Sequence, residues 1–157
     1  MQVRVFWIGK TRLAGIEALT EEYSRRLTRY CDFSGEAVRA ARRKSGASSG
    51  LALGSVKEEA AMLARSADST RVVLDAAGRT WTSEQFAAFL KSQQERGTRA
   101  ITFCVGGADG FSPEFRKQAG VLLSLSPLTM PHELARVVLL EQLYRAWTTL
   151  ANHPYPR

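Results

Sequence analysis

The sequence predicts an α/β fold, in which a mainly parallel sheet is covered by helices on both faces. Short apolar runs alternate along the chain with amphipathic stretches, and no hairpin signal joins two of the runs directly. The 157 residues, 45% of them hydrophobic, are enough for one domain with its own core, and we expect that domain to span residues 1–157.

The first elements follow from hydrophobic periodicity. Val3 to Ile8 is a continuous apolar run before Gly9, which predicts a buried strand. In the helix that follows, apolar residues recur at three- and four-residue steps: Leu13, Ile16, Leu19, Tyr23, Leu27 and Tyr30. We expect a second strand over residues 33–40. Residues 45–54 are rich in Ser, Gly and Ala and lack periodicity, which predicts a mobile loop.

Capping signals mark the next two helices. Ser55, followed by Glu58 three residues later, predicts a helix from Ser55 to Ala67. A third strand, Arg71 to Leu74, then leads into a turn at residues 75–78. Thr82 with Gln85, or Ser83 with Glu84, is expected to cap a helix that buries Phe86, Phe89 and Leu90 and that ends at Gly97.

The last third of the chain begins with a strand at residues 100–105 and a glycine-rich loop at residues 106–110. Ser112 and Pro113 are a typical cap and first-turn pair for a short helix. A strand at residues 121–125 and a loop precede a long helix from His132 to about Asn152. The four apolar residues 137–140 point around most of this helix, so we expect it to be buried on two sides and to form a homodimer with a second copy.

Composition limits the classes of function. Lys and Arg number 22 against 15 Asp and Glu, a formal charge of +7 that favours a polyanionic partner such as RNA. Seven of the cations lie between Arg25 and Lys44, although such a stretch is equally typical of a solvated face. Cys31 and Cys104 are expected to be reduced, and no metal-binding spacing is present. Without a long apolar run or a secretory signal, the protein is expected to be soluble and cytoplasmic.

Ligands of open parallel sheets bind beyond the carboxyl ends of the strands. Three loops qualify, those after Leu74, Val105 and Leu125, and the last two are rich in Gly, Ser and Pro. A pocket made of such loops suits an adenine ring and a neutral ribose better than a triphosphate. The chain lacks a dinucleotide-binding glycine pattern, a phosphate-binding P-loop and a hydrolase nucleophile elbow.

Four segments of the C-terminal third together resemble a known family. They are Val105-Gly106-Gly107-Ala108-Asp109-Gly110, Leu123-Ser124-Leu125-Ser126-Pro127-Leu128-Thr129, Pro131-His132-Glu133-Leu134-Ala135-Arg136 and Glu141-Gln142-Leu143-Tyr144-Arg145-Ala146-Trp147. In this order and spacing they are similar to the ribosomal RNA large subunit methyltransferase H (RlmH) family of SPOUT-class methyltransferases.

The resemblance implies a SPOUT fold with a deep C-terminal trefoil knot that holds S-adenosylmethionine. It implies a homodimer that acts on the ribosome and methylates N3 of a pseudouridine in 23S rRNA. Carried over by position, the cofactor-binding residues are Leu74, Gly106, Leu125, Ser126, Pro127, Leu128, Thr129 and Met130.

Methyl transfer from a sulfonium mainly requires alignment of donor and acceptor, together with removal of one proton from the acceptor nitrogen. His132 is the candidate base, Arg136 and Arg145 can stabilise an anion or hold phosphate, and Tyr155 and Arg157 are candidates for substrate contact. Two plainer interpretations remain open: His132 as a helix cap and Arg145 as the ion-pair partner of Glu141.

The tail departs from the family pattern, because Pro156 stands where relatives usually carry a histidine. This difference leaves an alternative function open, that of a noncatalytic ribosome-binding or assembly factor with the same fold.

Overall fold

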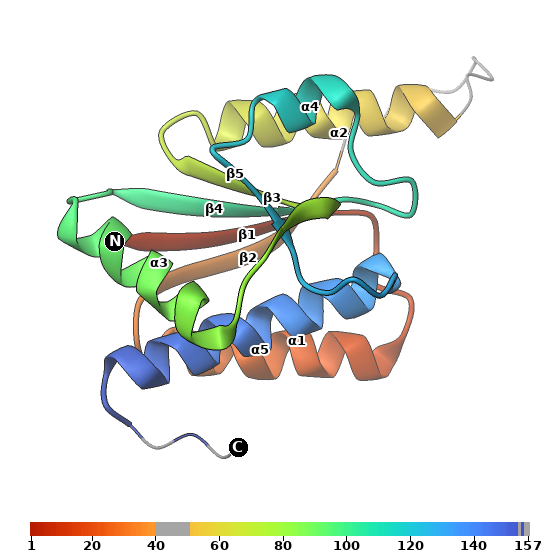
Figure 1. Ribbon diagram of the computed structural model, residues 1–157. Coiled ribbons are helices and arrows are strands. Elements are labelled where there is room, and N and C mark those ends of the chain that lie inside the picture. The colour runs from red at the N-terminus through yellow and green to blue at the C-terminus, as the bar shows by residue number, and fades with distance from the viewer. Residues whose placement is uncertain (40–50, 154, 156–157) are drawn as a thin grey trace.

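The computed structural model describes residues 1–39, 51–153 and 155, without the side chains of residues 51–55. Its centre is a five-stranded sheet of order β2-β1-β4-β3-β5 (Figure 1). All four strand pairings are parallel, as the alternating pattern predicts. The strands are β1 (Gln2–Ile8), β2 (Asp32–Val38), β3 (Thr70–Thr80), β4 (Ala100–Val105) and β5 (Val121–Ser124).

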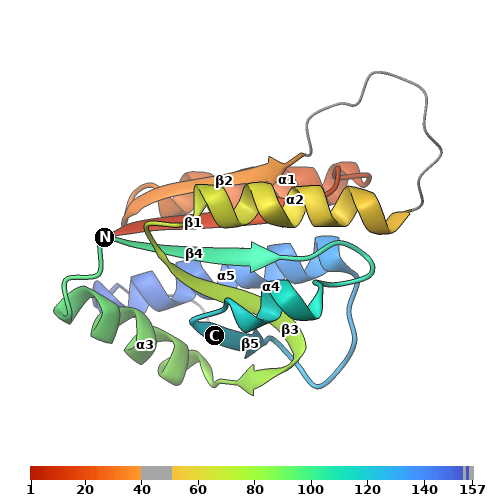
Figure 2. The same ribbon diagram turned by 90° about the horizontal axis from the view of Figure 1, so that it is seen from above.

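Helices cover both faces of this sheet (Figures 1 and 2). On one face lie α1 (Ala14–Leu27), α3 (Ser83–Glu95) and α5 (His132–Leu150), and on the other lie α2 (Leu51–Arg65) and α4 (Pro113–Lys117). Two apolar cores result. The larger packs residues such as Val5, Phe103 and Leu139 between the sheet and the first group of helices. The smaller packs Met62 and Phe115 against the opposite face.

The capping predictions for α3 and α4 are confirmed. The Thr82 hydroxyl accepts a hydrogen bond from the Gln85 backbone amide, and the Gln85 side chain accepts one from the Thr82 amide, which completes a capping box. Beyond α3, Gly97 has a positive φ of 72°. The Ser112 hydroxyl caps α4 by accepting from the Phe115 amide. Phe86 and Leu90 are buried as expected, whereas Phe89 is half-buried.

Two predictions in the middle of the chain are wrong. Helix α2 begins at Leu51, so Ser55 lies inside the helix, and only residues 45–50 of the expected loop fall outside the described residues. Strand β3 continues to Thr80 through the expected turn at residues 75–78. Its register with β5 shifts between Leu74 and Arg79, so a strand irregularity takes the place of the turn.

The apolar surface of α5 is largely covered within one chain. Leu139, Leu140 and Leu143 have no exposed surface, and Val137 is 7% exposed. Helix α5 packs against both α1 and α3. Burial on two sides is therefore confirmed, but the run of apolar residues does not by itself require a second copy of the chain.

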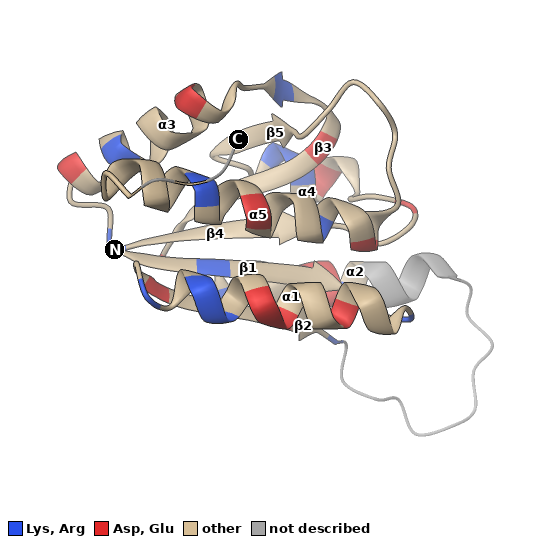
Figure 3. Cartoon of the chain, turned by 90° about the horizontal axis from the view of Figure 1, so that it is seen from below, with Lys and Arg blue, Asp and Glu red and all other residues tan. Residues whose placement is uncertain are grey.

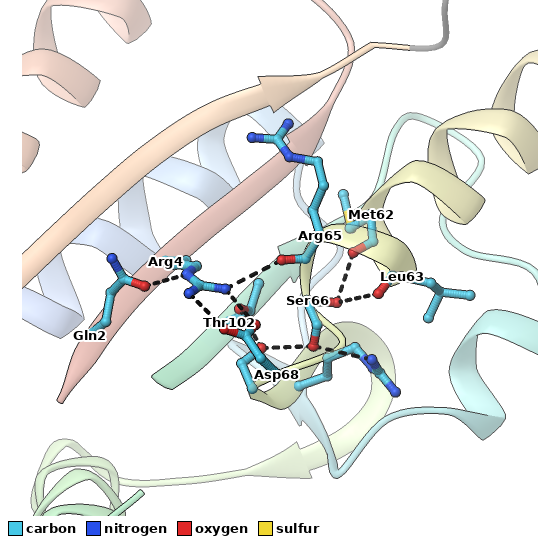
Figure 4. A network of polar contacts seen from close by, with 10 residues as sticks. Gln2, Arg4, Met62, Leu63, Arg65, Ser66, Asp68 and Thr102 are labelled. Carbon is cyan, nitrogen blue, oxygen red and sulfur yellow. Dashed lines mark hydrogen bonds and ion pairs between the residues drawn. The ribbon is translucent and has the colours of Figure 1, made fainter. Parts of the chain in front are cut away.

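Charged side chains are interspersed rather than gathered by sign. Figure 3 shows acidic and basic residues together on α1 and α5. Arg25 and Arg26 of the expected basic stretch both contact Glu22, while Arg42 to Lys44 lie outside the described residues. At the edge of the sheet where the strands begin, Arg4 pairs with Asp68 at 2.8 Å (Figure 4).

Within the described residues, no helix combines the length and the apolar character needed to cross a membrane.

Candidate functional site

Residues 74–76, at the irregularity within β3, and the loops after β4 and β5 line one cavity of about 340 Å³. From the predicted cofactor-binding set, the lining includes Leu74, Gly106, Leu125, Ser126, Leu128, Thr129 and Met130. Pro127 belongs to the same loop but is not part of the lining. The structure thus brings the three predicted segments together, although the one after Leu74 belongs to β3 and is not a loop. Their role in binding a cofactor stays a prediction.

The glycine-rich loop after β4 is folded tightly on itself. A Cβ atom added to Gly106 would lie 3.1 Å from the carbonyl carbon of Gly110, so the two backbone segments leave no room for a side chain. The loop ends at Ser112, whose amide and hydroxyl donate to the buried Glu59 carboxylate at 2.7 and 2.6 Å. Helix α2 therefore fixes the far end of the loop, and the backbone along the cavity is held in place.

The loop after β5 is organised by two serines. The Ser124 hydroxyl donates to the Ser126 carbonyl at 3.0 Å, and the Ser126 hydroxyl accepts from the Leu128 amide at 2.9 Å. The Leu128 side chain is 78% exposed although it borders the cavity. An exposed apolar side chain at the mouth of a cavity is available to pack against a ligand.

The wall of the cavity contains acidic groups that the sequence analysis did not single out. Asp75 and Asp109 both line it, and no Lys or Arg from the part of the chain that the structure describes does. Asp75 accepts from the Ala77 amide at 2.8 Å and pairs with Arg116 at 3.3 Å. Its position directly after the predicted strand at residues 71–74 was a signal that could have identified it. Such a wall favours a neutral or cationic ligand over a polyphosphate.

His132 also lines the cavity, at the first position of α5. The residue that precedes α5 is Pro131, and no side chain caps the helix, so the interpretation of His132 as a helix cap is wrong. Its Nε2 atom lies 4.0 Å from the position that a Cβ atom would take at Gly9. The imidazole is therefore located between the cavity and the loop after β1.

Arg145 and Tyr155 lie in a different place. Arg145 follows His132 by 13 positions on the same helix, a separation of about 20 Å at the helical rise. Figure 1 shows the start of α5 beside the loops at the carboxyl ends of the strands and its end at the opposite edge of the sheet. Within one chain, these two residues cannot act together with His132.

Arg145 and Tyr155 belong to an aromatic and cationic cluster. Arg145 pairs with Glu141 at 2.7 Å, as the plainer interpretation predicted, and its guanidinium lies 4.4 Å from the centre of the Tyr155 ring. Burial, followed by hydrogen bonds to Tyr23 and Glu141, raises the pKa of Tyr155. The phenol therefore stays protonated near neutral pH and is suited to donating a hydrogen bond, not to accepting a proton.

The two cysteines are unsuited to nucleophilic chemistry. Burial raises the pKa of the Cys31 thiol and that of the Cys104 thiol to about 12. Within residues 1–39, 51–153 and 155, no three His, Cys, Asp or Glu side chains are grouped so as to hold a metal ion.

Comparison with known proteins places this geometry in a family. A family model described as "Predicted SPOUT methyltransferase" matches residues 1–156. The chain is 40% identical to the ribosomal RNA large subunit methyltransferase H of Koribacter versatilis, over 99% of this chain and 97% of that protein. It is 39% identical to the protein of the same name from Herminiimonas arsenicoxydans, over 100% of this chain and 99% of the relative.

Among solved structures, the tRNA (m1G37) methyltransferase from Aquifex aeolicus superimposes with a TM-score of 0.61 at 12% identity, over 100% of this chain and 75% of that one. That likeness shows a shared fold. The family model and the full-length relatives go further, and they show that this chain belongs to the SPOUT methyltransferase family, alongside the ribosomal RNA large subunit methyltransferase H proteins.

Proposed function

We propose that this protein uses S-adenosylmethionine to methylate N3 of a pseudouridine in 23S rRNA, acting as a homodimer on the ribosome in the cytoplasm. The observation that carries the proposal is a cavity lined by part of β3 and by the loops after β4 and β5, with two carboxylates and, among the described residues, no Lys or Arg in its lining. It occurs in a chain that matches rRNA methyltransferases over almost its whole length.

The residues of the cavity fit this cofactor. Backbone groups of Gly106 and of residues 125–130 would hold the adenosine part, since the close approach of Gly106 to Gly110 and the two serine hydrogen bonds fix the backbone of both loops. The Asp109 carboxylate complements a positive charge, and Asp75 does so in part, because its carboxylate also pairs with Arg116. When bound, S-adenosylmethionine supplies a methyl group on a positively charged sulfur. The trefoil knot implied by the family resemblance belongs to this proposal as well.

His132 is the side chain best placed to handle the acceptor proton. It lines the cavity, it is half-buried, and a neutral imidazole nitrogen can accept a proton. The remaining task of the chain is to align the acceptor nitrogen with the methyl group and to exclude water, which accounts for most of the acceleration available to such a reaction.

The dimer is proposed from the part of α5 that the chain leaves uncovered. Leu134 is 43% exposed, and Val138, Gln142 and Arg145 follow it along one helical stripe and are all half-buried. If a second copy lies antiparallel on this stripe, the Arg145 end of one chain lies beside the cavity of the other. This arrangement would let Arg145 and Tyr155 contact the substrate, which a single chain does not allow.

The first experiment is mass mapping of rRNA nucleosides from cells with and without this protein. We expect one methylated pseudouridine to disappear from 23S rRNA and to return when the gene is restored. An unchanged modification profile would contradict the proposal and would favour a noncatalytic ribosome-binding factor.

Calorimetry with S-adenosylmethionine tests the cavity separately. Gly106→Ala places a Cβ atom against the backbone of Gly110, so we expect affinity to fall by about tenfold or more, equivalent to ~1.4 kcal/mol. Gly15→Ala in α1 is the control, because no heavy atom lies within 4 Å of its added Cβ and Gly15 does not line the cavity. Equal affinities for the two variants would place the cofactor elsewhere.

A further inference from the structure

The segment between β1 and α1, residues 9–13, borders the cavity without belonging to its lining; we refer to it as the β1–α1 loop. β1 is the sheet neighbour of β4, and a Cβ atom at Gly107 would lie 3.4 Å from Cγ2 of Ile8, where β1 ends. On the other side, Gly9 lies next to the imidazole of His132. The loop therefore continues the rim of the cavity.

Two side chains from the start of α5 hold this loop. Both carboxylate oxygens of Glu133 accept from the Arg12 backbone amide at 3.2 Å. The Arg136 guanidinium donates to the Thr11 hydroxyl at 2.8 Å. Because Glu133 and Arg136 follow His132 by one and four positions on α5, the loop and the imidazole are fixed to the same part of that helix.

Arg136 is buried without an ion pair among the described residues, which is unusual for a cation. It is 1% exposed, its guanidinium lies 4.4 Å from the centre of the Trp7 ring, and its Nε donates to the Thr20 hydroxyl at 3.2 Å. Within the described part of the chain it makes no ion pair. A buried charge without a carboxylate partner is a poor source of stability, which favours a positional role for Arg136.

The loop so held carries two exposed cations, Lys10 and Arg12. Among the described residues neither forms an ion pair, whereas Arg4, Arg26 and Arg116 each contact a carboxylate. An unpaired cation on a rigid support binds a phosphate with little further loss of conformational entropy. The acidic wall of the cavity thus suits the positively charged cofactor, and the two cations of the loop suit the phosphates of the RNA.

We propose that the β1–α1 loop is a phosphate-binding rim, in which Lys10 and Arg12 contact the RNA backbone beside the nucleotide that enters the cavity. Arg136 and Glu133 are positioning residues that hold the rim in register with His132. This inference rests on the proposed function, and it adds a substrate contact that fixes where the RNA lies without reading its sequence.

The test is the double variant Lys10→Ala/Arg12→Ala, with large ribosomal subunits from cells lacking this protein as substrate. Binding of the subunits and the KM of methyl transfer are measured over a series of KCl concentrations, and S-adenosylmethionine affinity is measured by calorimetry. Loss of two phosphate contacts should raise KM and reduce the slope of log Kd against log salt by about 1.4–1.8. Cofactor affinity should not change.

The matched control is Arg96→Ala/Arg99→Ala, which removes the same charge from two exposed residues between α3 and β4, at the opposite edge of the sheet. If both double variants behave alike, the effect is one of net charge and the rim is excluded. Weaker binding of S-adenosylmethionine by the Lys10/Arg12 variant would likewise overturn the proposal, since the loop would then serve the cofactor.

The positioning role is tested by Thr11→Val, which removes the hydroxyl that accepts from Arg136, with Thr11→Ser as the conservative rescue. We expect KM for the subunits to rise several-fold in the first variant and to recover in the second, and kcat to change little in either. Equal KM values for Thr11→Val and the wild-type protein would show that the hydrogen bond from Arg136 to Thr11 does not position the loop. If the wild-type protein transfers no methyl group, the proposed function fails, but the salt slopes of subunit binding still decide whether the rim exists.

Discussion

Gly78 lies where β3 and β5 are packed most closely, and its replacement by alanine is expected to disturb both stability and the cavity. A Cβ atom at Gly78 would lie 2.7 Å from three backbone atoms, the carbonyl carbons of Leu122 and Leu123 and the nitrogen of Leu123. Backbone atoms cannot rotate away as a flexible side chain can. The two strands must therefore separate by about 0.7 Å to restore ordinary van der Waals contact.

The expected cost follows from that overlap. Overpacking that forces backbone shifts costs ~1–3 kcal/mol, and a clash with three backbone atoms belongs at the upper end of that range. For a chain of this length, ~3 kcal/mol corresponds to a decrease in Tm of roughly 6–12 °C. Since β5 leads directly into the loop at residues 125–130, its displacement should also weaken binding of S-adenosylmethionine.

Thermal unfolding followed by circular dichroism measures the first effect, and calorimetry at a temperature where the variant is folded measures the second. Gly15→Ala in α1 is the control, because no heavy atom lies within 4 Å of its added Cβ and the change should stabilise the helix by about 0.5 kcal/mol. A Gly78→Ala protein as stable as the Gly15→Ala protein would refute the close packing of β3 on β5.

Three further outcomes are expected from local contacts. Thr82→Ala removes the capping box of α3 and should reduce the free energy of unfolding by about 1 kcal/mol in urea titrations, and Thr82→Ser should restore most of it. The hydrogen bond from Arg4 lowers the pKa of Asp68, so its contribution to stability is present at neutral pH and is lost as pH falls through the folded-state pKa. Asp68→Asn should therefore destabilise the protein at pH 7, and the difference from the wild-type protein should shrink as the pH is lowered. Because burial raises the pKa of both thiols to about 12, alkylation of Cys31 and Cys104 at pH 8 should be slow in the native protein and fast in urea, and rapid native labelling would contradict their burial.

Elements with a strong local signal could be predicted from the sequence. The strand at residues 100–105 was predicted with its observed bounds, because a short, mostly apolar run that closely follows Gly97 is typical of a buried parallel strand, and all six residues prove to be buried. The capping residues Thr82 and Ser112 were likewise identified, since a cap depends only on residues within one turn. The loops after β4 and β5 that line the cavity followed from strand ends and glycine content, whereas the segment expected to be a loop after Leu74 is part of β3.

Elements that depend on distant partners were missed. Residues 75–78 have the composition of a turn, yet they continue β3, because β5 supplies the pairing from another part of the chain. The start of α2 at Leu51 was missed since Ser, Gly and Ala give no periodic pattern.

The sequence by itself determined the α/β class, the parallel strands and the family, because apolar periodicity and short motifs are properties of neighbouring residues. Only the tertiary structure decided which residues share a site. It placed His132 at the cavity and Arg145 about 20 Å away along the same helix, and it joined Arg136 of α5 to Thr11 of the β1–α1 loop across 125 positions of sequence. The physical reason is that such contacts depend on how the sheet orders its strands and which helix ends it brings together, and no local pattern encodes that order.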